Sequence, residues 1–480
     1  MATLGHEVVG IDTDTAKIKA LAAGEAPFYE PGLPELLDEA LATGRLTFSS
    51  DIADVRGAEV HFICVGTPQL LGEIAADLSY VDAAADALLP HLSTGDLVVG
   101  KSTVPVGTAE RLTASLDETE TGALLAWNPE FLREGHAVKD TLHPDRLVYG
   151  VPSGSDGDRA TTLLDDVYAT LIAEDTPRLV TDLATAQLVK VAANSFLATK
   201  ISFINAMAEL CEATGADVTL LADAIGHDER IGRKFLNAGL GFGGGCLPKD
   251  IRAFMARAGE LGADQTLAFL REVDAINDRR RIRMIDIARD ECGGSIAGLR
   301  VAVLGASFKP NSDDVRDSPA LDVAEQMRLQ GADVVVTDPQ AIDNARPTTP
   351  TCPSSTPCSR RPPVPIWCCC SPSGPSTSRS IPRSSVPLSV SAASWTGVSC
   401  STRSRGATPA GFIALSADRD RNPGVRPLAR RRRAPRPGPV AEPGHRRVLR
   451  GDRAALVSVG RPRHRAAVDR PWRPHRLGSR

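Results

Sequence analysis

The residue whose surroundings most clearly suggest chemistry is Cys246, in the run Gly243-Gly244-Gly245-Cys246-Leu247-Pro248-Lys249-Asp250. Glycines let a ligand approach the backbone, and the nearby charge of Lys249 lowers the pKa of a thiol and favours the reactive thiolate. Most cysteines are merely small buried residues. Because a glycine-rich loop flanked by Pro-Lys-Asp is a poor place for a buried residue, we predict that Cys246 is a nucleophile, with Asp250 close to it.

Two pairs of polar residues are spaced four apart and could assist a nucleophile. Lys190 and Asn194 lie beside an apolar stripe of helical spacing, so a desolvated lysine and an amide on one face could stabilise a developing oxyanion. Taken alone, this pair is also typical of solvent-exposed residues. Glu130 and Glu134 would share one face of a helix, which suits a proton relay or an ordered water. Solvated acids at a helix start are an equally good interpretation of the second pair.

A dinucleotide site is suggested by Asp12, which ends the apolar run of residues 8–11. An acid at this point of a dinucleotide-binding unit hydrogen-bonds the adenosine ribose and disfavours a 2′-phosphate, which selects NAD over NADP. The simple alternative is a turn aspartate. Two further stretches follow predicted strands, at the carboxyl edge where α/β sheets bind ligands, and singly each could be an ordinary turn. They are Val65-Gly66-Thr67-Pro68 and Lys101-Ser102-Thr103-Val104-Pro105.

The glycine-rich turn that holds the pyrophosphate in such folds should come before the strand that ends at Asp12. The chain opens instead with Met1-Ala2-Thr3-Leu4-Gly5-His6, which resembles the end of the first helix. The turn and its strand are therefore expected to be missing, which predicts weak NAD binding and unpaired sheet edges. The run Gly239-Leu240-Gly241-Phe242-Gly243-Gly244 matches G-x-G-x-x-G by letters but follows a helix, so we reject it as a cofactor site.

The elements that must position these residues alternate between strand and helix at both ends of the first 345 residues. Hydrophobic periodicity predicts strands at 7–11, 60–65, 97–101, 124–127, 299–304 and 333–337, and helices at 32–43, 80–89 and 318–330. Residues 183–225 have only a long helical pattern. We predict an α/β protein with two Rossmann-like parallel-sheet domains, at 1–182 and 297–345, joined by a helical central domain at 183–293.

Composition changes sharply after residue 345. Residues 1–345 carry 29 Lys+Arg against 54 Asp+Glu, whereas residues 346–480 carry 26 Arg, no Lys and five acids. Pro, Ser and Arg dominate this tail, which we expect to be disordered and without strand periodicity. A basic tail that binds nucleic acid is one interpretation. A shifted reading frame is the favoured one, because the codons of residues 367–374, read two nucleotides further on, permit Val-Leu-Leu-Leu-Thr-Glu-Trp.

The composition also excludes some classes of protein. No apolar run reaches the roughly 20 residues that cross a bilayer, and the start has no signal-peptide pattern. Cys64, Cys211, Cys246 and Cys292 are widely scattered without a C-x-x-C pair, so they suggest neither a disulfide framework nor a zinc site. We therefore expect a cytoplasmic enzyme with no metal and no membrane partner.

Together these segments resemble the UDP-glucose 6-dehydrogenase family, from about Met1 to Asp338. The match is dense and in order, and its motifs are residues 5–12, Phe28-Tyr29-Glu30-Pro31-Gly32-Leu33, residues 101–108 and 129–135, Lys200-Ile201-Ser202-Phe203-Ile204-Asn205, and the Cys246 loop. Residues 230–232 and 235–239 look more like UDP-glucose enzymes than GDP-mannose ones. The chain departs from the family in the missing glycine turn, in Gly245 instead of the usual serine, and in the loss of the last third of the nucleotide-sugar domain.

The resemblance implies a chemistry for the candidate residues. A sugar C6 alcohol would be oxidised to a carboxylate with two NAD and one water, through a thiohemiacetal and a thioester on Cys246. Lys190 and Asn194 would stabilise the oxyanion. Glu130, Asp250 and Thr103 would handle protons and the hydrolytic water, and Glu134 would face the nicotinamide side.

The resemblance also implies binding residues and partners. Expected cofactor contacts are Asp12, Lys17, Val65, Gly66, Thr67, Pro68, Ser102, Thr103, Glu134 and Arg316. Expected sugar-nucleotide contacts are Glu130, Phe131, Leu132, Arg133, Glu134, Lys190, Asn194, Arg230, Asn237, Ala238, Gly239, Leu240, Gly241, Phe242, Gly243, Phe308 and Lys309. The expected substrate is UDP-glucose and the expected assembly a homodimer or higher homo-oligomer, with no nucleic-acid partner. The alternatives are another nucleotide-sugar dehydrogenase, such as one acting on GDP-mannose, and an inactive fragment.

Overall fold

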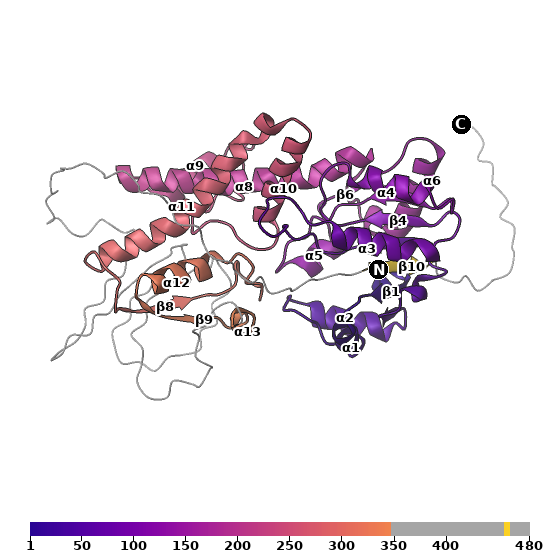
Figure 1. Cartoon of the computed structure of the whole chain (residues 1–480), viewed down its shortest axis with the longest axis horizontal. Coiled ribbons are helices and arrows are strands. Elements are labelled where there is room, and N and C mark those ends of the chain that lie inside the picture. Colours follow the sequence, from indigo (N-terminus) through magenta and orange to yellow (C-terminus); the bar gives the residue numbers. More distant parts are fainter. Residues whose placement is uncertain (347–455, 461–480) are drawn as a thin grey trace, which may run out of the picture.

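A computed structural model of the chain describes residues 1–346 and 456–460. An N-terminal domain built on a large sheet is joined by long helices to a small α/β unit (Figure 1). This architecture confirms the predicted fold class, with two sheet-containing units and a helical middle. The expectations for residues 347–455 and 461–480, including the shifted reading frame, lie outside the described residues.

The large sheet of the N-terminal domain has eight strands. They are β1 (Glu7–Ile11), β2 (Leu46–Ser49), β3 (Val60–Ile63), β4 (Leu97–Gly100), β5 (Leu124–Trp127), β6 (Leu147–Gly150), β7 (Arg178–Thr181) and β10 (Leu456–Gly460). Their order is β2-β1-β10-β3-β4-β5-β6-β7. β1 is parallel to β2, and β3, β4 and β5 are parallel to one another. The segments that follow β1, β3, β4 and β5 therefore leave the sheet at one common edge.

Helices cover both faces of this sheet. They are α1 (Thr15–Ala22), α2 (Leu33–Ala42), α3 (Ser79–Leu88), α4 (Thr108–Asp117), α5 (Ala137–Leu142), α6 (Ser155–Val167) and α7 (Ala169–Ala173). Successive strand residues point to opposite faces. Ile63 and Val98 accordingly belong to the core that contains α3 and α4, whereas Phe62 and Val99 pack with α6 and α7. Burial on both faces explains why β4 is a continuous apolar run and why β3 is apolar except for the buried His61.

The strand between β1 and β3 corrects two expectations from the sequence. β10 is antiparallel to both neighbours, with Val9 opposite Ser458 and Phe62 opposite Val457. The expectations that the tail holds no strand and that these sheet edges are unpaired are therefore wrong for residues 456–460. The physical reason is that unpaired backbone N–H and C=O groups at two edges accept a strand in either direction, and Leu-Val-Ser-Val is rich in strand-favouring residues.

The middle of the chain is helical, as predicted. Its helices are α8 (Leu183–Thr214), α9 (Val218–Gly226), α10 (Leu247–Glu260) and α11 (Ala268–Glu291). Asp182 caps the start of α8 by accepting a hydrogen bond from the amide of Thr185, and α8 ends at Gly215 in the left-handed region. The Ser202 hydroxyl donates to the carbonyl of Val273 over 2.7 Å and joins α8 to α11.

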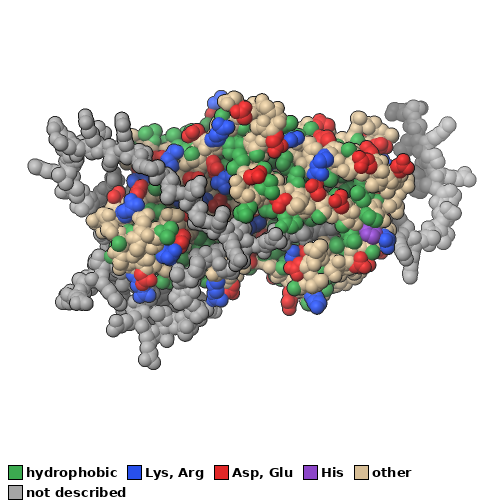
Figure 2. Space-filling view, viewed as in Figure 1, with side chains coloured by type: hydrophobic (Ala, Val, Ile, Leu, Met, Phe, Trp, Pro, Cys, Tyr) green, Lys and Arg blue, Asp and Glu red, His purple; other side chains and the backbone are tan. Residues whose placement is uncertain are grey.

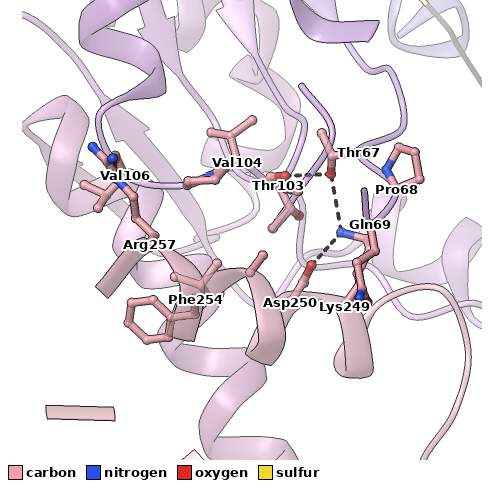
Figure 3. Close-up of a pocket in the computed structure, with 14 residues that line it drawn as sticks. Thr67, Pro68, Gln69, Thr103, Val104, Val106, Lys249, Asp250, Phe254 and Arg257 are labelled. Atoms are coloured by element: carbon pink, nitrogen blue, oxygen red, sulfur yellow. Dashed lines mark hydrogen bonds and ion pairs between the residues drawn. The ribbon is translucent and has the colours of Figure 1, made fainter. Parts of the chain in front are cut away.

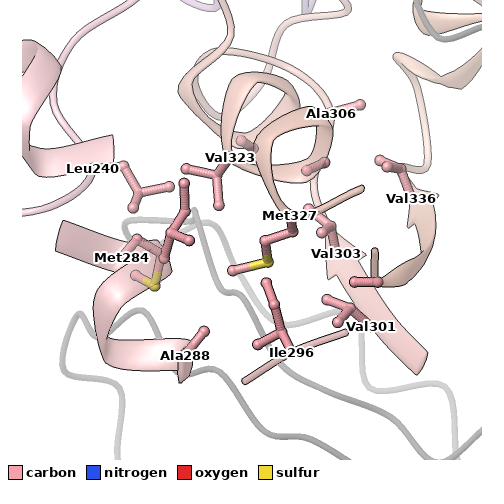
Figure 4. Close-up of a cluster of buried hydrophobic side chains, with 14 of the residues drawn as sticks. Leu240, Met284, Ala288, Ile296, Val301, Val303, Ala306, Val323, Met327 and Val336 are labelled. Carbon is pink, nitrogen blue, oxygen red and sulfur yellow. The ribbon is translucent and has the colours of Figure 1, made fainter. Parts of the chain in front are cut away.

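The small C-terminal unit consists of β8 (Arg300–Leu304), α12 (Pro319–Leu329), β9 (Asp333–Thr337) and α13 (Ile342–Ala345). β8 and β9 are parallel. In its core, Val303 and Met327 pack with Met284 and Ala288 of α11 (Figure 4). This shared core attaches the unit to α11. The segment between β8 and α12 contacts the loop before α10, where the carbonyl of Arg316 accepts the amide of Gly244.

Some features of the structure differ from the sequence analysis or bear on its exclusions. β2, β6 and β7 were not predicted from the sequence. Cys64, Cys211 and Cys246 are free, but Cys292 is disulfide-bonded, against the expectation of no disulfide. No helix among the described residues is long and apolar enough to span a membrane. Acidic and basic side chains are interspersed on the face drawn in Figure 2, and the coloured atoms form no large basic patch there.

Candidate functional site

The candidate cofactor residues meet at the common edge of the large sheet. Asp12 follows β1 and is 6% exposed, its Oδ1 accepts the amide of Asp14 over 2.9 Å, and its Oδ2 lies 2.7 Å from Nζ of Lys17. The segments after β3 and β4 are joined to each other: the Ser102 hydroxyl donates to the carbonyl of Val65, and the Thr67 hydroxyl to the carbonyl of Thr103, both over 2.7 Å. The parallel strands thus bring the separate motifs together, as predicted.

A cleft lies between these segments and α10. It is partly open to solvent and is lined by Thr67, Pro68 and Thr103 on the sheet side and by Lys249, Asp250 and Phe254 on the helix side (Figure 3). The Lys249 ammonium donates to the Thr67 hydroxyl over 3.3 Å, which connects the two walls. The cleft therefore joins the candidate cofactor edge to the helix that follows Cys246.

These residues fit NAD at its two ends. Asp12 presents a buried carboxylate for the adenosine ribose, and Thr67, Pro68, Thr103 and Val104 line the cleft against the helix that follows Cys246. The pyrophosphate in between calls for a helix N-terminus or a glycine turn. Within residues 1–346 and 456–460, no helix and no glycine turn follows the strand between β1 and β3 at this edge. That strand, β10, is antiparallel to both neighbours, so the chain enters the sheet here and does not leave it.

Cys246 lies directly before the first turn of α10 and is reached by solvent. Protein atoms nevertheless crowd its thiol, and the pKa of the thiol is raised above the ordinary value. Desolvation raises it most, and the carboxylates of Asp250 and Glu134 raise it further. The ammonium groups of Lys249 and Lys190 lower it. The expectation that positive charge lowers this pKa is therefore wrong for the free protein. Both lysines lower the pKa of the thiol, as expected, but desolvation and the carboxylates raise it by more.

Lys190 and Asn194 both point toward the helix of Cys246. The Asn194 amide donates to Oδ2 of Asp250 over 2.6 Å, and Asp250 is only 2% exposed. Lys190 is half-buried, and desolvation lowers the pKa of its ammonium, although the charges of Asp250, Cys246 and Glu130 oppose this shift. Lys190 is therefore a partly desolvated cation close to the thiol, as the functional interpretation of this pair requires.

Glu130 and Glu134 lie in a loop after β5, so the helical interpretation of this pair is wrong. Oε1 of Glu130 instead accepts the amides of Phe131 and Leu132 over 2.7 and 2.9 Å, and Oε2 lies 3.1 Å from Nζ of Lys101. Burial would raise the pKa of Glu130, but Lys101 and the two amides lower it below the ordinary value. The carboxylate is thus held ionised.

Lys101 belongs to a buried polar cluster that the sequence analysis did not assign. Its ammonium donates to Oδ1 of Asn128 over 3.1 Å, and the Tyr168 hydroxyl donates to the same oxygen over 2.6 Å. Burial would lower the pKa of Lys101, but the charge of Glu130 outweighs it and raises the pKa, and the pKa of the nearby Cys64 thiol is raised to about 11 by burial. A lysine at the end of an apolar strand was the one available signal for this cluster.

Glu134 is joined to the small C-terminal unit by Arg316. Nη2 of Arg316 lies 3.3 Å from Oε1 of Glu134, and its Nε donates to both carboxylate oxygens of Asp314 over 3.0 and 2.8 Å. Lys309 is near the same carboxylates: desolvation lowers the pKa of its ammonium, while Glu134 and Cys246 oppose the shift. Its ammonium also lies 5.2 Å from the ring of Phe308, which itself contacts the backbone at Gly244.

The remaining sequence-predicted contacts divide between the loop next to Cys246 and the surface. Residues 241–243 are held to α11, because Asn277 accepts the amide of Phe242 over 2.7 Å and donates to its carbonyl over 2.9 Å. The side chains of Leu240 and Phe242 are buried in hydrophobic clusters, as core residues are, and Ala238 packs against another.

Other members of the predicted set lie farther from the thiol or have local partners. The Gly239 amide donates to Asn205 over 2.8 Å, and the Asn237 side chain accepts from Arg233 over 2.7 Å. Arg230 is exposed and pairs with Asp228, while Arg133 pairs with Asp140. The Phe131 ring lies 5.6 Å from Nζ of Lys190 and 4.0 Å from Cζ of Arg146. Of these five predicted contacts, only Phe131 lies against the ammonium of Lys190.

Comparison with known proteins matches all three parts of the chain to one family. Residues 1–172, 184–279 and 302–359 match the NAD binding domain, the central domain and the UDP binding domain of the UDP-glucose/GDP-mannose dehydrogenase family. The chain is 45% identical over 348 residues to UDP-glucose 6-dehydrogenase of Rhizobium meliloti, covering 72% of this chain and 79% of that protein. It is 42% identical over 349 residues to UDP-glucose 6-dehydrogenase TuaD of Bacillus subtilis, covering 72% and 73%.

Solved structures give the same result. A UDP-glucose dehydrogenase from the archaeon Pyrobaculum islandicum has a TM-score of 0.68 at 42% identity, over 72% of this chain and 79% of that one. A UDP-D-ManNAc dehydrogenase from Pyrococcus horikoshii has a TM-score of 0.64 at 29% identity, over 71% and 79%.

Proposed function

Because the chain belongs to the UDP-glucose/GDP-mannose dehydrogenase family, and so to the NAD-dependent oxidoreductases, we propose that it oxidises the C6 hydroxyl of UDP-glucose to the carboxylate of UDP-glucuronate. The observation that carries this proposal is the group around Cys246. A solvent-accessible thiol, a partly desolvated Lys190 and the bonded pair Asn194–Asp250 lie together, and Asp250 also lines the cleft formed by the NAD-domain motifs. The relatives named as UDP-glucose 6-dehydrogenases support the choice of substrate.

NAD would be held by Asp12, Lys17, residues 65–68 and residues 102–104, and when bound it supplies the hydride acceptor for each of two oxidations. We expect a high KM for NAD, because the described residues supply no helix N-terminus for its pyrophosphate.

Cys246 would act between the two oxidations. Its sulfur adds to the C6 aldehyde to form a thiohemiacetal, which keeps the substrate on the protein, and the oxidised product of that adduct is a thioester. Water then attacks the thioester carbonyl, the C–S bond breaks, and the thiol is regenerated with release of the carboxylate. Since the pKa of the free thiol is raised, deprotonation would require the positive charges of Lys190 and Lys249 to prevail once substrate is bound.

The other polar groups would stabilise charge or move protons. Lys190 would donate to the oxyanion that forms when sulfur or water adds to the carbonyl, and Asn194 would do so from the same face of α8. Asp250 and Thr103, which line the cleft, would orient the hydrolytic water. Both oxygens of Glu130 already accept hydrogen bonds, so we assign it a fixed negative charge that orients Lys190 and water.

A direct assay tests the proposed reaction. The purified chain at high NAD concentration is incubated with UDP-glucose, GDP-mannose or UDP-N-acetylmannosamine, and NADH absorbance and products by mass spectrometry are followed. We expect two NADH per UDP-glucuronate from UDP-glucose, and little turnover of the others. Preferential oxidation of GDP-mannose would favour the second candidate substrate. A folded chain, checked by circular dichroism, that turns over none of them would favour the inactive fragment.

We further propose that the chain forms a homodimer or a higher homo-oligomer. Apolar side chains are exposed along α8 at intervals of seven or eight residues, with exposures of 37% at Leu188, 65% at Phe196, 47% at Phe203 and 57% at Leu210. Such a stripe on a long helix is suited to packing against the same helix of a second copy. Light scattering on the eluted protein gives the mass, and a strictly monomeric chain at micromolar concentration would contradict this proposal.

A further inference from the structure

The position directly before Cys246 has no side chain, and the guanidinium of Arg316 occupies the space that a side chain would take. A Cβ built on Gly245 would lie 2.5 Å from Nη1 of Arg316, whereas real Cβ atoms essentially never approach closer than 3.0 Å. Gly245 is not in the left-handed region of backbone conformation, so its own φ would accept any residue. The Arg316 side chain is therefore what opposes a larger residue at this position.

Arg316 is held there by contacts to three segments. Its Nε donates to Asp314 beside it in the chain, its Nη2 reaches Glu134 in the loop after β5, and its backbone carbonyl accepts the amide of Gly244 over 2.9 Å. The neighbouring glycines are as tightly covered, because a Cβ on Gly244 would meet the ring of Phe308. The segment of residues 308–317 thus closes over the glycine run, with the guanidinium next to the nucleophile position.

Charged groups approach Cys246 from every element around it. Lys249 and Asp250 belong to α10, Lys190 to α8, Glu134 to the loop after β5, and Lys309 and Arg316 to the small C-terminal unit. Glu134 disfavours the thiolate. Arg316 lies next to both Glu134 and the thiol, so its positive charge compensates that carboxylate where the thiolate forms.

We propose that Arg316, seated in the space left open by Gly245, is a positioning residue for Cys246: it fixes Glu134 and balances its charge, so that the thiolate forms more readily than it would beside an uncompensated carboxylate. The inference rests on the proposed role of Cys246 as the nucleophile. Glycine at position 245 is then required for this role of Arg316, because any side chain would displace the guanidinium from Glu134. Since the guanidinium is the flexible end of a long side chain, a small residue at 245 should displace it without unfolding the loop.

The test uses the reactivity of the thiol in the free full-length protein, so it needs neither NAD nor substrate. Iodoacetamide alkylation of the peptide that contains Cys246 is followed by mass spectrometry from neutral to alkaline pH. We expect Gly245→Ala and Arg316→Met each to slow alkylation at neutral pH by about three- to tenfold, since one pKa unit corresponds to a factor of ten. The midpoint of the pH profile should move up, with the alkaline plateau unchanged. Gly259→Ala, a control on α10 whose added Cβ meets nothing within 4 Å, should react like the wild type.

The double variant separates the proposal from simple obstruction. If Gly245→Ala acts by displacing Arg316, adding it to Arg316→Met should cause no further loss. Losses that multiply would mean that the new methyl group only blocks the reagent, and would overturn the proposal. An unshifted midpoint in Arg316→Met would overturn it as well, and this variant answers the question even if Gly245→Ala fails to fold. Because no turnover is measured, an inactive but normally alkylated enzyme would contradict the proposed function and leave this inference standing.

Discussion

Asn194 donates a hydrogen bond of 2.6 Å to Asp250, and this contact joins the helix that follows Cys246 to the longest helix among the described residues. The other carboxylate oxygen of Asp250 accepts from Lys249, so each oxygen has one partner and keeps a further acceptor site. The two bonds fix the orientation of the carboxylate, and substrate binding that draws Lys249 or Asn194 away would make it a stronger base for the hydrolytic water.

Asn194→Ala should destabilise the protein as well as the site. Asp250 is almost fully buried, and losing one donor leaves a charged oxygen desolvated, for which we expect a loss of about 1–3 kcal/mol in the free energy of unfolding. Urea denaturation gives this value. Asn237→Ala removes an amide that pairs with a surface arginine and should cost less than about 0.5 kcal/mol. Equal losses in the two variants would show that the contact with Asp250 stabilises the protein no more than a surface hydrogen bond does.

Cys246→Ser should abolish formation of the uronate. A serine hydroxyl is far less acidic than a thiol, so little alkoxide is available to capture the aldehyde, and an ester is a poorer intermediate than a thioester. We expect a loss of at least about a thousandfold in uronate production, measured by mass spectrometry. Cys211→Ser changes a buried cysteine distant from the cleft and serves as the control. Uronate formation at the wild-type rate by Cys246→Ser would refute the nucleophile assignment.

Lys101→Met should change the pH dependence of stability. Glu130 has a lowered pKa in the folded protein, so it contributes stability above its ordinary unfolded pKa, and this contribution is lost as the pH falls through the folded value. Without Lys101, burial would raise the folded pKa, so Glu130 would contribute less stability at neutral pH and have less to lose on acidification, and the difference in free energy of unfolding between the variant and the wild type should shrink as the pH falls. Because the Glu130 side chain is 37% exposed, water screens the pair, and we expect about 1–2 kcal/mol at neutral pH rather than the 3–5 kcal/mol of a fully buried pair.

Thermal melts across the acid range measure this effect, and Lys19→Met, at an exposed position on α1, is the matched control. A Lys101→Met protein whose loss of stability relative to the wild type is the same at neutral and at acid pH would show that Lys101 does not hold Glu130 ionised.

The pairing of β10 can be tested by hydrogen exchange. Val457 is opposite both Gly10 and Phe62, and proline at 457 removes an N–H and cannot continue a central ladder. We expect Val457→Pro to accelerate exchange in the peptides of β1 and β3 by at least about tenfold, and to leave β5 and α8 unchanged. Val457→Thr keeps a strand-favouring residue and should retain protection. Unaltered exchange in Val457→Pro would contradict the pairing.

The enzyme should prefer NAD to NADP by at least about tenfold in kcat/KM, because the buried carboxylate of Asp12 would repel a 2′-phosphate. Asp12→Asn keeps the size of the side chain and removes its charge, so it should narrow the preference. Comparable values for both cofactors in the wild type would count against the role of Asp12.

The sequence predicted what depends on local pattern. β1, β5 and β9 have the predicted bounds, because alternating or continuous apolar residues specify a strand locally. Contacts among distant segments were not predictable in the same way: Lys101, Asn128 and Tyr168 come from three separate parts of the chain. The predicted direction of the Cys246 pKa shift was wrong for a similar reason. A neighbouring lysine is visible in the sequence, whereas desolvation and the approach of Glu134 arise only in the folded protein.

The antiparallel pairing of β10 has a consequence for how the protein is made. Glu7 is opposite Gly460, so the large sheet cannot close until almost the whole chain has left the ribosome. At roughly 5–20 residues per second, β1 and β3 would wait on the order of 20–90 s for their common neighbour, exposing two strand edges throughout. During that interval the nascent chain is open to capture by chaperones or by the strands of other copies. Its yield in a cell should therefore depend on synthesis rate and temperature more steeply than its final stability would suggest.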